Sequence, residues 1–290
     1  MRSGVQSEYG TLAAVLLYRP GPEVGWHPDP ASILHLRPID HAALVREFDG
    51  LFALYASLGV EVATVDPAPL DGDRHYLFNM MYCRDLLFMT PAGAIMAGMA
   101  SPVREREPAY AGRTLSAHGI PVLGTVSGAG RFEGADALWI TDRLVAVGVG
   151  NRTNLAGFEQ VRDLLQPQGV ACVPLPSYQR LTQHLLGTVQ LVDRDLALVR
   201  TGLADPAAVR FLTEHGYRIV PLPESAEVRN RQAMNVVTVA PRTVIMPAGC
   251  PETREIYRAA GLAVAGEPAI TQLTAGAGGL ACATGILARR

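Results

Sequence analysis

Hydrophobic and polar positions repeat along this chain with a period of about 50 residues. Two β-prone runs joined by a short polar or Pro/Gly turn, a pattern typical of a β-hairpin, occur four times. The predicted hairpins begin at Leu87, Ala137, Val189 and Val236.

A second pattern follows each hairpin and is also present near the start of the chain. It consists of an amphipathic helical stretch, a glycine, and a short apolar strand. A glycine at that point is typical of the left-handed residue that ends a helix. These glycines are Gly59, Gly119, Gly169, Gly216 and Gly261. The chain is therefore predicted to contain five hairpin–helix–strand units.

Five such units form either a closed ring or an open solenoid. A helix in every unit argues against a propeller of four-stranded blades. A closed α/β ring with its strands inside fits better, and an ordinary α/β sandwich with accidental regularity is the alternative. No proline/serine linker or charge run divides the chain, so residues 1–290 are expected to form a single domain.

Composition narrows the classes of function. The chain is 49% hydrophobic and 18% charged, enough to bury a substantial core. A formal net charge of −2 gives no general attraction to phosphate, so nucleic acid is not an expected partner. The sequence contains no lysine, which excludes Schiff-base and Walker lysine chemistry. No apolar stretch is long enough to span a membrane.

The four cysteines, Cys83, Cys172, Cys250 and Cys282, are far apart and form no C-x-x-C pair. Neither a metal site nor a disulfide framework is indicated. The predicted compartment is the cytoplasm, because it keeps thiols reduced. A dinucleotide-binding loop at "GAGGLA" is excluded, because the chain ends before a βαβ unit could follow.

Polar residues stand at similar points of the repeat. Asp85 precedes the first hairpin, Glu133 and Asp136 the second, and His184 the third, while Cys282 lies in "GGLACATG". A ring would bring these points together at one mouth. A cysteine thiolate attacks as a nucleophile, histidine transfers protons, and carboxylates bind a planar cation such as guanidinium.

Each of these residues also has a structural interpretation. A cysteine such as Cys282 is more often a core residue, and His184 alone would more often be a hydrogen-bonded structural histidine. Asp85 beside Arg84 is also compatible with a surface ion pair. "EGAD" is also compatible with turn chemistry. Only the occurrence of all these residues together favours a catalytic site.

The ordered set "NMMYCRD…RFEGAD…GVGNRTN…HLLG…GGLACATG", from Asn79 to Arg289, resembles the guanidino-group-modifying pentein superfamily. This group includes dimethylarginine dimethylaminohydrolases, arginine deiminases, arginine dihydrolases and amidinotransferases. The resemblance implies a five-bladed pentein α/β-propeller built from five ββαβ-type repeats. The superfamily also contains a non-catalytic ribosome-binding factor, so a binding protein is an alternative of another class.

The resemblance also implies roles for individual residues. Cys282 corresponds to the nucleophile and His184 to the acid/base. Glu133 resembles the glutamate that contacts the guanidinium or the histidine. Asp85 is similar to the aspartate that grips the guanidinium nitrogens, and Asn79 lines the same pocket.

Three further residues complete the implied substrate-binding set. Arg104 and Arg152 resemble the pair that binds the substrate's α-carboxylate, with Arg106 a less favoured substitute for Arg104. Asp136 is placed with the substrate-binding residues because it shares the "EGAD" motif with Glu133.

The implied reaction is hydrolysis of the guanidinium of arginine or an N-substituted arginine through a covalent Cys282 thiouronium. His184 protonates the departing amine and then activates water, and no metal or organic cofactor is needed. The amidinotransferase reaction, in which an amine replaces the water, is the alternative.

Two departures from the superfamily pattern are present. Leu186 replaces the aspartate of an H-x-D motif, which favours the dimethylarginine hydrolase or dihydrolase branches, and Ala281 stands where relatives often carry a larger or polar residue. The apolar stretch "MAGMASPV" is a candidate contact for a homodimer.

Overall fold

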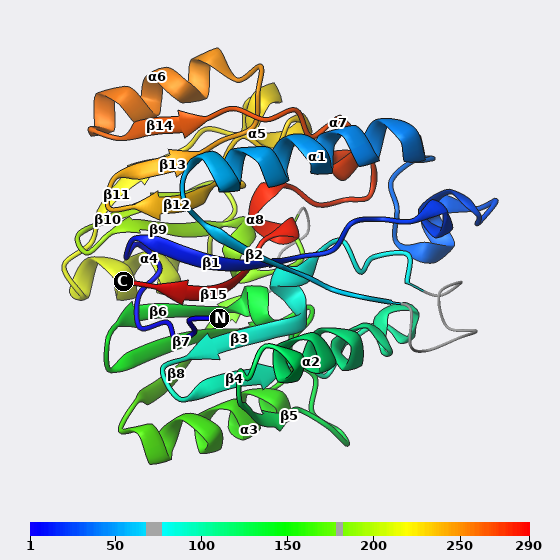
Figure 1. Ribbon diagram of the computed structural model, residues 1–290. Coiled ribbons are helices and arrows are strands. Elements are labelled where there is room, and N and C mark those ends of the chain that lie inside the picture. The colour runs from blue at the N-terminus through cyan, green and yellow to red at the C-terminus, as the bar shows by residue number, and fades with distance from the viewer. Residues whose placement is uncertain (68–76, 178–181) are drawn as a thin grey trace.

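The computed structural model describes residues 1–67, 77–177 and 182–290. In this part of the chain the strands form five three-stranded sheets arranged around a common centre (Figure 1). In each sheet the middle strand is antiparallel to one neighbour and parallel to the other. The fold is therefore the predicted ring of five ββαβ blades.

Four blades follow one another along the chain, and each has its helix between its second and third strands. The first two blades are β3 (Leu87–Thr90), β4 (Gly93–Met96), α2 (Glu107–Ala117) and β5 (Val122–Thr125), then β6 (Ala137–Thr141), β7 (Leu144–Gly150), α3 (Leu155–Leu165) and β8 (Ala171–Ser177). The next two are β9 (Val189–Asp193), β10 (Leu196–Val199), α4 (Pro206–Glu214) and β11 (Arg218–Pro221), then β12 (Val237–Ala240), β13 (Thr243–Ile245), α6 (Pro251–Ala260) and β14 (Ala263–Gly266).

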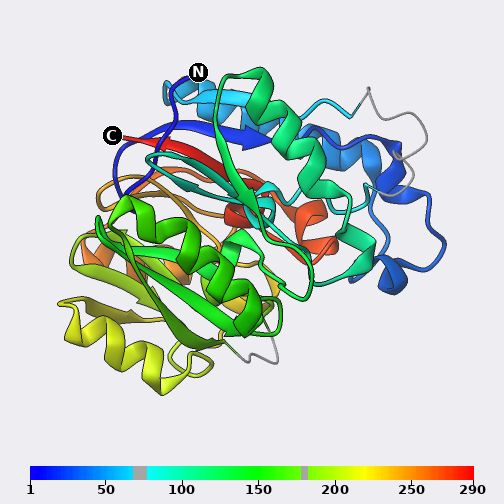
Figure 2. The same ribbon diagram turned by 90° about the horizontal axis from the view of Figure 1, so that it is seen from below.

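The remaining blade joins the two ends of the chain. It contains β1 (Leu12–Leu17), α1 (His41–Ser57) and β2 (Glu61–Thr64), and its missing hairpin strand is β15 (Gly285–Arg289). β15 pairs antiparallel with β1, and the Gly4 amide donates to the Leu287 carbonyl at 2.9 Å. The chain ends lie near one another in both views of the ribbon (Figures 1 and 2). Ring closure through β15 was not predicted from the sequence.

The helix-ending glycines behave as predicted. Gly59, Gly119, Gly169, Gly216 and Gly261 all have φ between 67° and 86°. This is the left-handed region that a side chain disfavours. Each glycine turns the chain from its helix into the third strand of the blade.

Short helical turns precede the first strand of four blades. They are η4 (Cys83–Leu86) before β3, η6 (Gly134–Asp136) before β6, η8 (Leu185–Gly187) before β9 and α8 (Leu280–Ala283) before β15. The turns of neighbouring blades contact one another: α8 touches η4, η4 touches η6, and η6 touches η8. The larger helices lie at the periphery (Figure 2). The ring therefore places residues of four distant segments in one cluster.

The other short helices are η1 (Pro22–Gly25), η2 (Pro30–Ile33), η5 (Pro102–Arg104), η7 (Gln166–Gln168), α5 (Ala226–Asn230) and α7 (Thr271–Ala275). Across the described ranges, none of the helices has the length and apolar character that crossing a membrane requires.

Candidate active site

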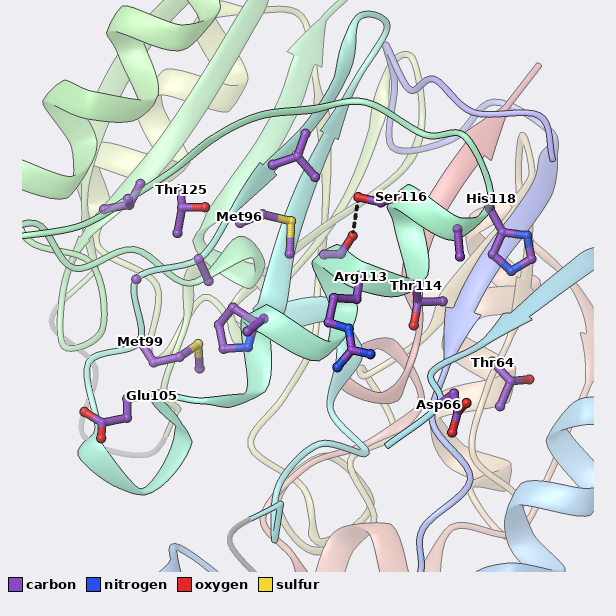
Figure 3. A pocket seen from close by; sticks show the side chains of 18 of the residues that line it. Thr64, Asp66, Met96, Met99, Glu105, Arg113, Thr114, Ser116, His118 and Thr125 are labelled. Carbon is purple, nitrogen blue, oxygen red and sulfur yellow. Dashed lines mark hydrogen bonds between the residues drawn. The ribbon is translucent and has the colours of Figure 1, made fainter. Parts of the chain in front are cut away.

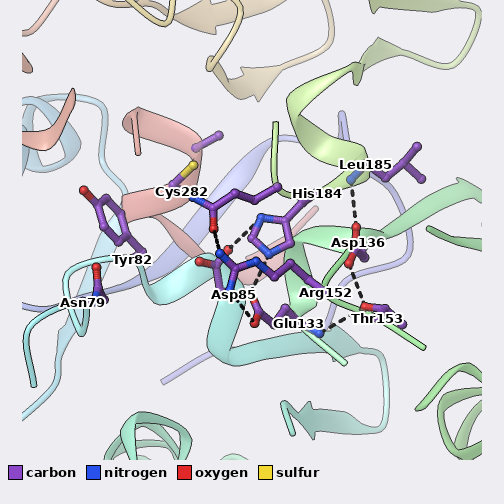
Figure 4. A network of polar contacts seen from close by, with 12 residues as sticks. Asn79, Tyr82, Asp85, Glu133, Asp136, Arg152, Thr153, His184, Leu185 and Cys282 are labelled. Carbon is purple, nitrogen blue, oxygen red and sulfur yellow. Dashed lines mark hydrogen bonds and ion pairs between the residues drawn. The ribbon is translucent and has the colours of Figure 1, made fainter. Parts of the chain in front are cut away.

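The cluster of turns supplies most of the predicted site. Asp85 lies in η4, His184 caps η8, and Cys282 lies in α8. These three side chains line a cavity of about 230 Å³, together with Asn79 and Arg104. Figure 4 shows the polar contacts that link His184 with Asp85 and Glu133, with Asn79 and Cys282 beside them. Five of the eight residues predicted for the site therefore share one cavity.

His184 is held between two carboxylates. Its Nε2 donates to Glu133 Oε2 at 2.6 Å, and its Nδ1 lies 3.8 Å from Asp85 Oδ1. Burial alone would lower the pKa of His184, but the charges of Asp85 and Glu133 raise it to about 9. Burial would raise the pKa of the Glu133 carboxyl, but the hydrogen bond with His184 lowers that pKa to about 2. At neutral pH the pair is thus an imidazolium and a carboxylate.

Cys282 is partly buried, and its Sγ accepts a hydrogen bond from Asn235 Nδ2 at 3.1 Å. Burial and the nearby Asp85 carboxylate raise the pKa of the Cys282 thiol to about 11. In the free protein the sulfur is therefore protonated at neutral pH. A cation bound in the cavity would offset the charge of Asp85 and favour the thiolate.

Asp85 has one occupied oxygen and one open oxygen. Its Oδ2 accepts a hydrogen bond from Arg104 Nη1 at 2.5 Å. Its Oδ1 is buried and receives no hydrogen bond from residues 1–67, 77–177 or 182–290. A buried carboxylate oxygen without a donor is costly unless a ligand supplies one. This oxygen therefore marks where a cationic N–H donor would bind.

Arg104 differs from expectation in how its donors are used. Its Nε donates to Glu107 at 2.8 Å, and its Nη2 lies 3.3 Å from the carbonyl oxygens of Asn79 and Tyr82. Together with the bond to Asp85, these contacts surround the buried guanidinium with acceptors of the protein. In this arrangement Arg104 orients Asp85 rather than offering free donors to a substrate carboxylate.

Asn79 lines the cavity, and its side chain is bonded to the backbone of a neighbouring segment. Its Nδ2 donates to the Ile33 carbonyl at 2.8 Å, and its backbone amide donates to Glu107 at 3.1 Å. The side chain thus anchors the segment that brings Leu34 and Leu36 to the cavity. Leu36, which lines the cavity, is 73% exposed.

Glu133, Asp136 and Arg152 do not line the cavity but lie behind it. Asp136 Oδ1 accepts from the Leu185 amide at 2.8 Å, which fixes the backbone next to His184, and Asp136 Oδ2 accepts from Thr153. Burial raises the pKa of Asp136 to about 6. Both oxygens have protein donors, so these contacts differ from the expected contact with substrate.

Arg152 is bound to neighbours within the protein. Its Nη2 donates to Gln183, and its Nη1 lies 3.9 Å from Glu133 Oε1. Arg106 is exposed at the start of α2 and is not among the cavity-lining residues. The role of Arg152 at a substrate carboxylate stays a prediction.

Several cavity residues were not predicted from the sequence: Asn235, Gln183, Arg229, Gln232 and Tyr82. A signal for Asn235 was present, because it stands two residues before β12, the first strand of its blade. Asp85 has the same place before β3. No such periodic signal marks the other four residues.

Three of the site residues also form a set that could hold a metal ion. Asp85, Glu133 and His184 offer oxygen and nitrogen atoms that all lie within 4.8 Å of one another. Such oxygen and nitrogen donors suit Zn²⁺. An ion there would have to displace the direct hydrogen bond between His184 and Glu133.

A larger hollow of about 1030 Å³ lies elsewhere, along α2 and the edges of β4 and β5 (Figure 3). The face of α2 toward it carries small residues, including Ala109, Gly112 and Ser116. The helix of the next blade, α3, packs differently, because the large side chain of its Leu164 covers Gly124 of β5. The hollow contains His118, Asp66 and Glu105 but no cysteine, and it has no counterpart of the His184–Glu133 bond among its described residues.

The fold and the geometry define a class of protein: a five-bladed ring whose centre holds a partly buried cysteine beside a buried histidine and buried carboxylates. Comparison with known sequences agrees with this class. Residues 74–215 match the arginine deiminase family. The chain is 26% identical over 246 residues to an N(G),N(G)-dimethylarginine dimethylaminohydrolase of Streptomyces coelicolor, covering 83% of this chain and 84% of that one.

Solved structures with the same fold include a dimethylarginine dimethylaminohydrolase and an amidinotransferase. A dimethylarginine dimethylaminohydrolase from Pseudomonas aeruginosa, in complex with citrulline, aligns with a TM-score of 0.76 at 18% identity, covering 94% of this chain and 98% of that chain. SxtG, an amidinotransferase of saxitoxin biosynthesis from Microseira wollei, aligns with a TM-score of 0.79 at 15% identity, covering 99% and 97%.

One further relative is an uncharacterized protein of Aeropyrum pernix, 25% identical over 189 residues. That match covers 65% of each chain, so the chain spans about two thirds of this relative's length. Taken together, the matches make the chain similar to arginine deiminases and dimethylarginine dimethylaminohydrolases, and the solved structures show the same five-bladed α/β-propeller fold.

Proposed function

We propose that the protein hydrolyses the guanidinium group of arginine or an N-substituted arginine through a covalent intermediate on Cys282. The observation that carries the proposal is the open, buried Oδ1 of Asp85, in a cavity that it shares with Cys282 and His184. A guanidinium supplies the missing N–H donors and a charge that complements the carboxylate.

Binding and activation are coupled in this mechanism. The positive charge of the guanidinium offsets Asp85, which lowers the pKa of the Cys282 thiol, and the thiol proton leaves to water. The thiolate then attacks the guanidinium carbon and forms a C–S bond. The electron pair of the C=N bond moves to nitrogen, which gives a tetrahedral adduct.

His184 carries the proton for the next step. The imidazolium, kept protonated by Glu133 and Asp85, gives its proton to the departing amine as the C–N bond breaks. The enzyme then holds an S-alkylthiouronium and a neutral His184. A water molecule gives one proton to His184 and attacks the same carbon, which forms a second tetrahedral adduct. As the C–S bond breaks, its electron pair returns to sulfur, the hydroxyl proton passes to the thiolate, and a C=O bond forms, which restores the Cys282 thiol.

Two features bear on the choice of substrate. Leu186 is buried and lines the cavity where an aspartate would hold an unsubstituted nitrogen, which favours an N-methylated guanidinium. We also propose that Arg152 approaches a substrate carboxylate once Gln183 is displaced, because Arg104 has its donors occupied.

The alternative reaction is amidino transfer, in which an amine replaces water as the second nucleophile. Similarity to SxtG over almost the full length of both chains is the observation that favours it. A non-catalytic binding protein is the remaining alternative, and it gives no reason for the Cys282, His184, Glu133 and Asp85 arrangement. The four free cysteines fit the reducing cytoplasm that we propose as the compartment.

The test is mass spectrometry of products after incubation with arginine, N-methylarginine or asymmetric dimethylarginine. We expect citrulline from the methylated substrates, and no product with Cys282→Ala. Cys172→Ala, at a partly buried cysteine outside the cavity, is the matched control and should retain activity.

Each other outcome has a defined meaning. Ornithine from arginine would indicate dihydrolase chemistry. Product formed only after addition of an amine acceptor would establish amidino transfer instead of hydrolysis. If none of these conditions gives a product that depends on Cys282, the hydrolase proposal is wrong.

A further inference from the structure

The ring places one polar residue in front of the first strand of every blade, and the reaction described above uses four of them. Asp85 precedes β3, Glu133 precedes β6, His184 precedes β9 and Cys282 precedes β15. The fifth such position, before β12, is occupied by Asn235. Asn235 lines the cavity, and 8% of the residue is exposed.

A single amide makes three contacts with the cysteine segment. Asn235 Oδ1 accepts from the backbone amides of Ala281 at 2.6 Å and Cys282 at 3.3 Å, and Asn235 Nδ2 donates to Cys282 Sγ at 3.1 Å. The reversed amide would point its NH2 at two backbone N–H donors. The network therefore fixes which end of the amide faces the sulfur.

The local backbone is built to allow this approach. A Cβ on Gly279 would lie 2.7–2.8 Å from Asn235 Cγ, Cβ and Oδ1, so only glycine leaves room for the amide. On the other side, the backbone N–H of Asn235 donates to the Gln232 carbonyl at 2.7 Å. Gln232 lies in a turn and has a φ of 56°. The side chain is therefore held from both directions.

We propose that Asn235 is a positioning residue that selects the thiolate form of Cys282. Its carbonyl holds the backbone of α8, and its N–H donor strengthens its bond to sulfur as the sulfur becomes negative. Asp85 has the opposite effect on the same sulfur. The balance between donor and carboxylate keeps the thiol inactive until a cation enters. The catalytic consequence rests on the proposed function, but the effect on the thiol does not.

The test therefore measures the thiol directly. Iodoacetamide alkylation of Cys282 is followed against pH by mass spectrometry of the tryptic peptide 259–289, which contains no other cysteine. Asn235→Asp keeps the acceptor and the shape but loses the donor. We expect the midpoint of its alkylation rate against pH to rise by at least about one pH unit, so that alkylation at pH 8 is about tenfold slower.

Two other variants separate the donor from other effects. Asn235→Ala removes the donor without adding charge, and its profile should also move up, by a smaller amount. Asn154→Asp is the matched control, because Asn154 also accepts two backbone amides and donates through Nδ2, but outside the cavity. Its Cys282 profile should stay within about 0.3 pH unit of the wild type.

The outcomes distinguish the interpretations. Unchanged alkylation profiles in both Asn235 variants would overturn the proposal. A shift in Asn235→Asp alone would also overturn it, because the added negative charge, not the lost donor, would then explain the shift. If Asn235→Asp does not fold, as judged by circular dichroism, the Asn235→Ala profile decides. Because alkylation needs no guanidine substrate, the result is independent of whether the hydrolase proposal succeeds. Where turnover is found, kcat should fall in Asn235→Ala with KM little changed.

Discussion

At the scale of single residues, the site works through opposed electrostatic effects on two protons. The Glu133 carboxylate keeps His184 protonated, while Asp85 and burial keep Cys282 protonated. In the proposed mechanism, the resting site therefore has His184 protonated for the leaving group and Cys282 still in its thiol form. In the same mechanism a cationic substrate offsets the charge of Asp85 and favours the thiolate, while the bond to Glu133 still holds the proton on His184. Activation of Cys282 is thereby tied to occupancy of the cavity.

Replacing Glu133→Gln should lower the pKa of His184, because the closest carboxylate is lost while Asp85 remains. Activity that requires the imidazolium should then disappear at a lower pH than in the wild type. NMR titration of labelled histidines checks this directly, with Glu159→Gln, at an exposed position in α3, as the control. A His184 midpoint within about 0.3 pH unit of the wild type would contradict it.

The same change has a consequence for stability with a defined sign. The pKa of His184 in the folded protein is raised above the ordinary value of about 6.5. Its contribution to stability is therefore fully present below pH 6.5 and is lost as the pH rises through about 9. The lowered pKa of Glu133 adds stability that is lost as the pH falls from about 4.5 to about 2. The difference in unfolding free energy between wild type and Glu133→Gln should accordingly be largest between about pH 4.5 and 6.5.

At the scale of elements, the small residues before Cys282 have a steric reason. A Cβ on Gly276 would lie 2.3 Å from Tyr82 Oη, and one on Gly278 would lie 2.2 Å from Tyr82 Cε1. Tyr82 is buried and donates to the Leu273 carbonyl at 2.8 Å, so it has little freedom to move. The loop into α8 thus packs directly on an aromatic ring from the turn before η4.

Gly278→Ala should therefore destabilise the protein by about 1–3 kcal/mol, the usual cost of overpacking. It should also lower kcat, because α8 carries Cys282. Urea denaturation and steady-state kinetics measure the two effects. Gly50→Ala, in α1 with no atom within 4 Å of the added Cβ, is the control and should raise stability by about 0.5–1 kcal/mol. Equal stability of the two variants would refute the packing argument.

Elements that have a local pattern could be predicted from the sequence, and those that depend on long-range pairing could not. The four hairpins follow from alternating apolar residues around turns, and the five glycines follow from helix termination. The partners of Arg104 had no such signal, because the contact with Asp85 joins residues that sequence periodicity does not relate. Asn235 has the same place before β12 as Asp85 has before β3, but it was missed because a single amide between apolar residues does not by itself indicate chemistry.

At the scale of the whole molecule, closure of the ring depends on one strand from each end of the chain. β15 pairs with β1 from Leu12 to Leu16, and α8 with Cys282 comes immediately before β15. The sequence did not predict this closure, because β15 is a short apolar run that resembles any strand. Loss of β15 would free both an edge of β1 and the nucleophile segment.

A chain ending at Thr284 should therefore fail to unfold cooperatively. The matched control retains every residue: its original ends are joined by a short Gly/Ser linker, and new ends are made between the exposed residues Thr201 and Gly202. We expect this permuted chain to fold and to alkylate at Cys282 like the wild type. Thermal unfolding followed by circular dichroism compares the two. A cooperative transition of the truncated chain at the wild-type temperature would disprove the role given to β15.

The position of β15 also has a consequence for biosynthesis. Ribosomes make a chain from its amino terminus, so the blades that carry Asp85, Glu133 and His184 emerge before the strand that completes the ring. Synthesis therefore produces the side chains of Asp85, Glu133 and His184 before that of Cys282, so the cluster can assemble only after the segment that carries Cys282 has left the ribosome.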